Sequence, residues 1–282
     1  MTNLSIKDIL LKSSEYLKNK GIVSSRYDTE MIISHFMKVP RMNIYLDFEK
    51  IVSQDIADLI RQAIIERGKR KPLQYILGYV YFLDCLIQIN ENVLIPRPET
   101  EFMVDMICKN RKTFLNILDL CSGSGAIAIA LKKNFIDAHV FASDVCEKTI
   151  KIAENNAKKN NVEISFLQSD LFNVFNNDLN PIFFDLIISN PPYISSDEYD
   201  ILEPEIFFEP KKALVAEKKG LYYLEKIIVT AKHFLSNEGF IYLEIGSNQS
   251  EILYQIAEKN NYSDIEIIKD LNEKNRVMRI KK

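Results

Sequence analysis

The sequence lacks the residue patterns that build metal centres and disulfide frameworks. Its four cysteines form no CxxC pair, and its three histidines are scattered among them. Neither a metal-ligand spacing nor a disulfide pattern therefore emerges. We expect no bound metal, and a reducing cytoplasm is the simplest location for the protein.

Long apolar runs and an excess of positive charge are also absent. No run approaches the roughly 20 residues needed to cross a membrane, and the first residues lack the basic start and apolar core of a leader peptide. The formal net charge is -3, so there is no broad basic field for gripping a phosphate backbone. The short basic run at residues 67–71 is more typical of a solvated helix end. We expect no membrane partner and no direct nucleic-acid substrate.

What is present suits a soluble globular protein with one large and one small domain. The chain has 282 residues, of which 47% are hydrophobic and 27% charged. From residue 5 to about 67, apolar residues recur at helical spacing, beginning with Ile6, Ile9 and Leu10. We predict a small helical domain over residues 1–72.

A β-hairpin is expected next. Two short β-like runs, 79–82 and 86–89, are separated by Asp84. Prolines at 96 and 98 then stiffen the entry to a helix that runs to about Cys108. We interpret residues 73–98 as a linker and residues 99–282 as the larger domain.

In the larger domain, strands alternate with amphipathic helices. The strand-like runs are nearly continuous in apolar content, as expected of strands buried on both faces of a parallel sheet, and they cover 114–120, 139–144, 164–169, 184–189 and 240–245. Helical stretches lie at 126–133, 147–160, 221–234 and 249–259. This alternation predicts a doubly wound α/β sheet. A last pair of runs, 265–268 and 276–280, could complete the sheet as a hairpin.

A glycine-rich turn, residues 119–125, follows the first of these strands and opens a helix. Its glycines would let backbone N–H groups approach a ligand at the helix N-terminus. Gly123, Gly125 and Ala128 also fit a loose dinucleotide fingerprint, which is weak evidence alone. Asp144 ends the second strand, where it could accept hydrogen bonds from ribose hydroxyls.

Asp119 favours one ligand over another. A carboxylate four residues before Gly123 would repel a pyrophosphate, but it suits the cationic amino group of S-adenosyl-L-methionine. Asp170 follows the third strand, where it and nearby apolar side chains could hold adenine. Any one of these acids could merely cap a helix. Together they lie at the carboxyl ends of adjacent parallel strands, where open α/β sheets bind ligands.

The tetrapeptide Asn190-Pro191-Pro192-Tyr193 follows the fourth strand on the same rim. Asn190 precedes a proline and is therefore extended, and neither proline can donate a hydrogen bond. Asn190 Oδ1 and the Pro191 carbonyl could accept the two N–H groups of a planar amide or amine, while the Tyr193 ring covers its face. A plain turn is the alternative. Beside a sulfonium methyl group, this slot predicts an N-methyltransferase.

Over nearly its whole length, the chain resembles the bacterial-type release factor glutamine methyltransferases. Besides the glycine turn and the tetrapeptide, the likeness includes residues 72–78, 94–101, 208–214 and 243–246. The tetrapeptide is shared with adenine-N6 DNA methyltransferases and is moderately specific. The segment Ile-Pro-Arg-Pro-Glu-Thr-Glu at 95–101 is far more specific.

The resemblance implies an α/β, Rossmann-like class I fold with a seven-stranded, mostly parallel sheet, an N-terminal helical docking domain and a hairpin linker. It also implies transfer of a methyl group from S-adenosyl-L-methionine to the N5 amide nitrogen of the Gly-Gly-Gln glutamine of peptide chain release factors. The products would be N5-methylglutamine and S-adenosylhomocysteine.

From these arguments together we expect two sets of site residues. The substrate set is Asn190, Pro191, Pro192 and Tyr193, of which Asn190, Pro191 and Tyr193 are expected to be catalytic. The cofactor set is Asp119, Cys121, Ser122, Gly123, Ser124, Gly125, Asp144, Asp170, Leu171, Phe172 and Asn190. The family commonly has glycine at the position of Cys121 and often tryptophan at that of Leu171, so the contact with adenine falls to Leu171 or Phe172.

Three other functions stay open at this point. A sister enzyme would methylate a glutamine of a ribosomal protein, and an adenine-N6 nucleic-acid methyltransferase would use the same tetrapeptide but should have a basic groove. A methyltransferase fold that only binds a partner is disfavoured by the intact site residues. Arg97 and Glu99 could contact the substrate or simply form a rigid linker and helix start.

Overall fold

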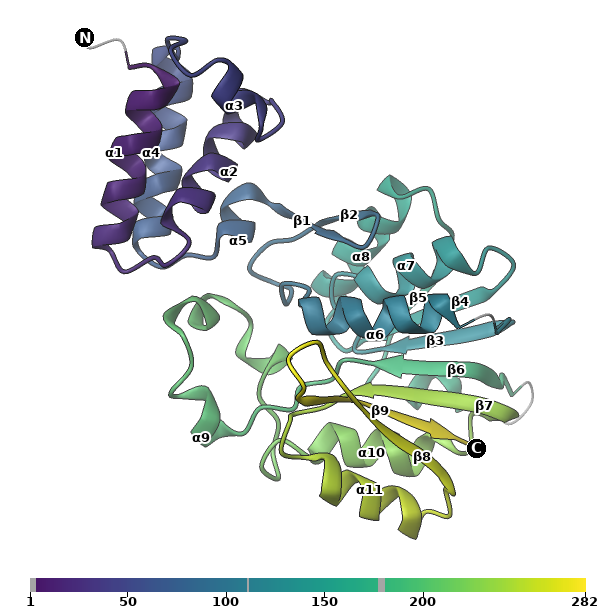
Figure 1. Ribbon diagram of the computed structural model, residues 1–282. Coiled ribbons are helices and arrows are strands. Elements are labelled where there is room, and N and C mark those ends of the chain that lie inside the picture. Colours follow the sequence, from purple (N-terminus) through teal and green to yellow (C-terminus); the bar gives the residue numbers. More distant parts are fainter. Residues whose placement is uncertain (1–3, 111, 177–180) are drawn as a thin grey trace. The chain divides into compact units, whose positions relative to one another are not determined.

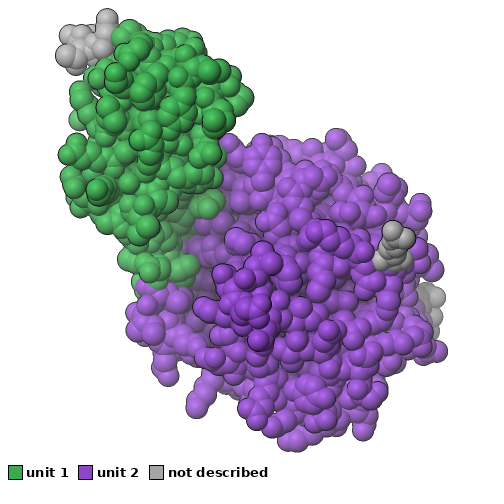
Figure 2. Space-filling view, viewed as in Figure 1, with its two compact units in different colours: residues 1–78, 203–208 green, residues 79–202, 209–282 purple. Residues whose placement is uncertain are grey.

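The computed structural model describes residues 4–110, 112–176 and 181–282. The chain divides into two compact units, drawn in different colours in Figure 2. One unit extends to Gly78 and also includes Glu203–Phe208, and the other comprises Tyr79–Leu202 and Glu209–Lys282. The predicted boundary at residue 72 lies within the first unit, a few residues before its end.

The first unit is helical, as the apolar spacing indicates. Its helices are α1 (Ile6–Asn19), α2 (Ser25–Met37), α3 (Asn43–Leu46), α4 (Gln54–Gly68) and α5 (Leu73–Leu77). A capping box of Ser5 and Asp8 begins α1, and Gly78, with φ 80°, ends α5 in the left-handed region. Helix α5 lies in the stretch interpreted as linker, where five residues are too few to show a helical period.

A remote segment completes the helical unit. Arg67, near the end of α4, is buried and pairs with Asp28 of α2 at 2.7 Å and with Glu205 at 3.0 Å. Arg70 also bonds to Glu205, at 2.7 Å. Glu205 belongs to the 3-10 helix Pro204–Phe208, so these ion pairs hold Glu203–Phe208 among the N-terminal helices.

The predicted hairpin begins the second unit. It consists of β1 (Tyr79–Phe82) and β2 (Cys85–Gln88), paired antiparallel with Phe82 opposite Cys85. The side chain of Asn156, in α8 (Glu147–Lys159), accepts from the N–H and donates to the carbonyl of Gln88, each at 2.9 Å. One buried amide thus extends the hydrogen bonding of β2 onto a helix of the larger fold.

Among the described residues, seven strands form the central sheet of this unit, which confirms the expected fold class (Figure 1). They are β3 (Asn116–Leu120), β4 (His139–Asp144), β5 (Ser165–Gln168), β6 (Phe184–Ser189), β7 (Leu235–Glu244), β8 (Asp264–Lys269) and β9 (Asn275–Lys281). Their order is β5-β4-β3-β6-β7-β9-β8. The pairings are parallel except those of β9 with β7 and β8. The last two strands form the expected hairpin.

Helices cover both faces of the sheet. In Figure 1, α6 (Pro98–Lys109), α7 (Ala126–Asn134) and α8 lie over one face, and α10 (Tyr222–Ala231) and α11 (Ser250–Lys259) over the other. Shorter elements are α9 (Ser196–Tyr199) and the 3-10 helices Asn173–Phe175 and Lys211–Ala213. The chain proceeds from β3 towards one edge and from β6 towards the other, so the carboxyl ends of β3 and β6 adjoin at a topological switch point, where open sheets bind ligands.

Candidate active site

A cavity of about 300 Å³ lies at the carboxyl ends of β3, β4 and β6 in the larger unit. This volume is at the lower end of the range for small-molecule sites. Seven of the predicted site residues line it: Cys121, Gly123, Asp144, Asp170, Leu171, Asn190 and Pro192. The structure therefore brings together residues from the glycine turn after β3, from the ends of β4 and β5, and from the tetrapeptide after β6.

The glycine turn is built from left-handed backbone positions. Cys121, Gly123 and Gly125 have φ values of 58°, 55° and 80°. The first of these is costly for a residue with a side chain, which gives a physical reason for glycine to be common there. At Gly125 a Cβ atom would come within 3.0 Å of the Ala153 Cβ, so glycine also allows α7 and α8 to pack closely.

Asp144 is the carboxylate of this turn that reaches the cavity. Its Oδ2 accepts from the Gly123 N–H at 3.0 Å and its Oδ1 from the Cys146 N–H at 2.9 Å. Burial raises the pKa of Asp144, and these two N–H groups act against that rise. Each oxygen keeps a free lone pair, so Asp144 can accept hydrogen bonds from a ligand's hydroxyl groups.

Asp119 lies beneath the turn rather than in the cavity wall. It has no solvent exposure, and its Oδ2 accepts from the Ala128 N–H in the first turn of α7 at 3.3 Å. Within the described residues, its Oδ1 has no hydrogen-bond partner. Burial raises the pKa of Asp119 to about 8. The carboxyl group ties β3 to α7, and its contact with a cationic ligand stays a prediction.

Leu171 and Phe172 have different surroundings. Leu171 lines the cavity with a left-handed φ of 49°, whereas Phe172 is buried in the core and stacks on Phe234 at 4.9 Å. Of these two apolar residues, Leu171 is the one that a ligand in the cavity would meet. Asp170 is exposed at the cavity, with its Oδ2 3.8 Å from the Lys226 ammonium group.

Asn190 presents its amide between the cavity and a buried hydroxyl. Its Nδ2 donates to Thr100 Oγ1 of α6 at 2.9 Å. Among the residues that the structure describes, none donates a hydrogen bond to Asn190 Oδ1 or to the Pro191 carbonyl. The two predicted acceptors therefore keep their capacity for an external donor. Pro191 itself is buried and Pro192 lines the cavity.

Tyr193 is turned inward instead of covering the cavity. Its hydroxyl donates to Glu244 Oε1, at the end of β7, at 2.9 Å. The ring packs against the main hydrophobic core, and burial raises the pKa of the phenol. In the described chain, Tyr193 does not line the cavity, and neither do Ser122, Ser124 and Gly125. Their expected roles in binding stay predictions.

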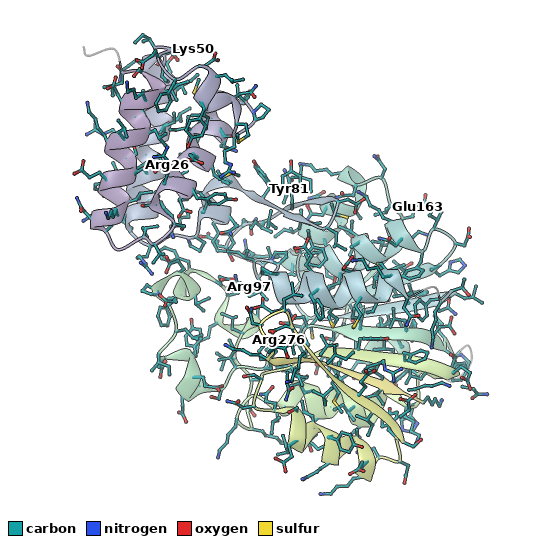
Figure 3. The ribbon with its side chains drawn as sticks, viewed as in Figure 1. Arg26, Lys50, Tyr81, Arg97, Glu163 and Arg276 are labelled. Carbon is teal, nitrogen blue, oxygen red and sulfur yellow. The ribbon has the colours of Figure 1, made fainter. Side chains whose placement is uncertain are left out.

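Arg97, labelled in Figure 3, forms an ion pair with Glu209. The buried Glu209 carboxylate also accepts from the Ile95 N–H at 3.0 Å. Residues 95–97 and 209 come from two of the segments that carry the resemblance, and this ion pair joins them. Arg97 thus has a structural partner, and Glu99 lies in the first turn of α6.

Several cavity residues were not expected from the sequence. They come from the hairpin exit, the loop after the tetrapeptide and the start of α10, and include Asn92, Val93, Lys212, Tyr222 and Tyr223. Thr100 and Glu244 were also missed. The signal for Glu244 was its position at the end of an apolar strand, because a buried acid needs specific partners.

Comparisons with known proteins agree with this geometry. The family model for the PrmC N-terminal domain matches residues 8–78, and that for the methyltransferase small domain matches residues 98–253. A release factor glutamine methyltransferase of Thermodesulfovibrio yellowstonii is 39% identical over 90% of this chain and 92% of its own length. One from Fusobacterium nucleatum is 38% identical over 98% of this chain and 78% of its own. The chain belongs to the release factor glutamine methyltransferase family.

A solved structure supports the fold of this family member. The T. thermophilus 16S rRNA N2 G1207 methyltransferase, in complex with AdoMet and guanosine, superposes with a TM-score of 0.54 at 14% identity, over 72% of this chain and 49% of that one. At this identity the likeness concerns the fold alone. The predicted family, enzyme class and methyl donor, S-adenosyl-L-methionine, are confirmed by the family matches and by the named relatives.

The site of this release factor glutamine methyltransferase family member fits its methyl donor. The backbone at Gly123 is open, with no atom closer than 4.0 Å to an added Cβ, and Asp144 offers carboxylate oxygens beside it. Apolar side chains, including Leu171 and Val93, supply the wall for a flat base. In the described part of the chain, no cluster of three possible metal ligands occurs and no helix is long and apolar enough to cross a membrane.

Proposed function

We propose that this protein methylates the side-chain amide nitrogen of the glutamine in the Gly-Gly-Gln motif of peptide chain release factors. S-adenosyl-L-methionine is the donor, and the products are N5-methylglutamine and S-adenosylhomocysteine. The observation that carries the proposal is a pair of acceptors, Asn190 Oδ1 and the Pro191 carbonyl, that no described residue engages, with Asn190 itself lining the cavity. Because release factors act in translation, we place the enzyme in the cytoplasm.

The chemical difficulty lies in the amide nitrogen, whose lone pair is delocalised into its carbonyl group. Hydrogen bonds from its two N–H groups to Asn190 Oδ1 and the Pro191 carbonyl raise the electron density on nitrogen and aim its lone pair. Bound S-adenosyl-L-methionine supplies an electrophilic methyl group. A nitrogen–carbon bond forms as the sulfur–carbon bond breaks, the electron pair stays on sulfur, and one amide proton leaves for solvent after transfer.

The same geometry supports roles for the cofactor residues. We assign Asp144 to the ribose hydroxyls, Leu171 to one face of adenine, and the backbone at Cys121 and Gly123 to the amino-acid end of the donor. Asp119 supports the turn from beneath. Pro192 and Asn190 close the cavity on the substrate side.

The test is a methyl-transfer assay with radiolabelled donor, in which a release factor, ribosomal proteins and DNA are offered side by side. We expect label on the release factor glutamine. Label on a ribosomal protein or on DNA instead would replace this substrate with one of the alternatives.

Asn190→Ala is expected to lower the transfer rate by about a hundredfold or more, because the substrate amide loses one of the two hydrogen bonds that position it. Binding of the donor, measured by calorimetry, should change little. Asn272→Ala, in the exposed turn after β8, is the matched control and should behave as wild type. If Asn190→Ala transfers methyl groups at the wild-type rate, the proposed binding of the substrate amide by Asn190 Oδ1 and the Pro191 carbonyl is wrong.

A further inference from the structure

A buried carboxylate lies behind the tetrapeptide. Glu244 ends β7 with 1% of its surface exposed. Its Oε1 accepts from the Tyr193 hydroxyl at 2.9 Å, and its Oε2 accepts from Thr100 Oγ1 at 2.5 Å. Burial raises the pKa of Glu244, whereas Arg276, labelled in Figure 3, acts to lower it. One side chain thus holds two hydroxyl groups from distant parts of the chain.

The bonds from Thr100 and Tyr193 and the nearby Arg276 guanidinium favour the ionised form of Glu244, and while Glu244 is ionised the hydrogen bonds in this network have a fixed direction. An ionised carboxylate only accepts, so the single hydroxyl hydrogen of Thr100 is used for Glu244. Thr100 Oγ1 can then only accept, and its other partner, at 2.9 Å, must be the NH2 end of the Asn190 amide. The network therefore determines which end of that amide faces Thr100, a choice that distance alone leaves undetermined.

We infer that Thr100 and Glu244 are positioning residues for the methyl acceptor, because the direction of their hydrogen bonds keeps Asn190 Oδ1 on the cavity side. The inference rests on the proposed function, since it concerns the group that receives the substrate amide. A reversed Asn190 amide would set its own N–H donors against those of the substrate. Two donors facing each other lose a hydrogen bond and leave polar groups unsatisfied.

The same carboxylate holds both ends of the tetrapeptide. Asn190 is reached through Thr100, and Tyr193 is bonded to Glu244 directly. A fully buried carboxylate is costly to keep, and apolar replacements of buried charges are often at least as stable. A role in positioning Asn190 and Tyr193 for the substrate amide explains the presence of a buried carboxylate at position 244 better than fold stability does.

Thr100→Val tests the inference, since it removes the hydroxyl group and keeps the shape of the side chain. We expect kcat with release factor to fall by about ten- to a hundredfold, while the Kd for S-adenosyl-L-methionine changes less than about twofold. Thr100→Ser restores the hydroxyl and should recover most of the rate. Ser236→Ala is the matched control: it removes a 2.9 Å bond from a hydroxyl group to the Asp185 carboxylate at the opposite end of β7, and should leave kcat unchanged.

A second measurement needs no substrate. By NMR, the Asn190 Nδ2 hydrogen that faces Thr100 should exchange slowly with water in the wild type and in Thr100→Ser, and rapidly in Thr100→Val. The inference is wrong if Thr100→Val protects this hydrogen as well as the wild type does. It is also wrong if Thr100→Val keeps the wild-type kcat, or if its binding of S-adenosyl-L-methionine weakens as much as its kcat falls. A wild-type enzyme that leaves release factor unmethylated overturns the proposed function instead, and the exchange data still decide the inference.

Discussion

The carboxyl group of Asp119 lies beneath the glycine turn and has no solvent exposure. Burial raises its pKa to about 8, from an ordinary value of about 4. The folded protein therefore binds this proton more tightly than the unfolded chain does. The contribution of Asp119 to stability is fully present below pH about 4 and is lost as the pH rises towards 8.

Asp119→Asn should remove this dependence. We expect the difference in free energy of unfolding, variant minus wild type, to increase between pH 5 and pH 8 by up to about 1.4 kcal/mol per pH unit. Urea titrations of both proteins without cofactor at three pH values measure the difference. Asp137→Asn, at an exposed position, should keep a constant offset from wild type. A constant offset for Asp119→Asn would mean that its pKa is not raised.

The residues of the site differ in how far the sequence could predict them. Asp144 ends a buried apolar strand and Asn190 directly follows another. Their place at the carboxyl edge of the sheet can therefore be deduced from neighbouring residues alone. Thr100 and Glu244 could not be assigned a role in this way. The bond between Thr100 and Asn190 joins residues that are 90 positions apart in the chain, and the bond between Thr100 and Glu244 joins residues that are 144 positions apart. No local sequence pattern indicates which hydroxyl group a buried carboxylate will contact.

Among the elements, the long apolar strands were the most predictable. Strands β4 and β6 have the expected bounds, whereas β7 begins at Leu235 instead of residue 240. Its first half contains Ser236, Glu238 and Gly239, which interrupt the apolar run. Helices α5 and α9 have five and four residues, too few to show a 3.6-residue period.

The ion pairs of α4 lead to a prediction at this scale. Arg67→Ala would leave the buried Asp28 carboxylate without its partner. We expect the helical unit to lose about 3–5 kcal/mol of stability, as is usual when one member of a buried pair is removed. Urea unfolding followed by circular dichroism measures the loss.

Lys7→Ala serves as the control for Arg67→Ala, because it breaks an exposed pair with Glu49 and should have little effect. Glu203–Phe208 should also exchange its amide hydrogens faster in Arg67→Ala. Equal stability of the two variants would show that the Arg67 pairs do not hold the unit together.

At the scale of the whole molecule, the described cavity is lined entirely by residues of the larger unit. Adding S-adenosylhomocysteine at a hundred times its Kd should stabilise that unit by about 2.7 kcal/mol. In hydrogen-exchange mass spectrometry, we expect protection at residues 121–125 and 190–193 and none in α1, α2 or α4. Comparable protection of α1 would place part of the binding site in the helical unit.

The membership of Glu203–Phe208 in the helical unit has a consequence for engineering. The backbone passes from one unit to the other after Gly78, after Leu202 and again after Phe208. A chimera made by a single splice at Gly78 would therefore import foreign helices without the hexapeptide that packs with them, and Glu205 would lose its native partners Arg67 and Arg70. Exchange of the helical unit between relatives requires two grafts, one at each stretch of sequence, made together.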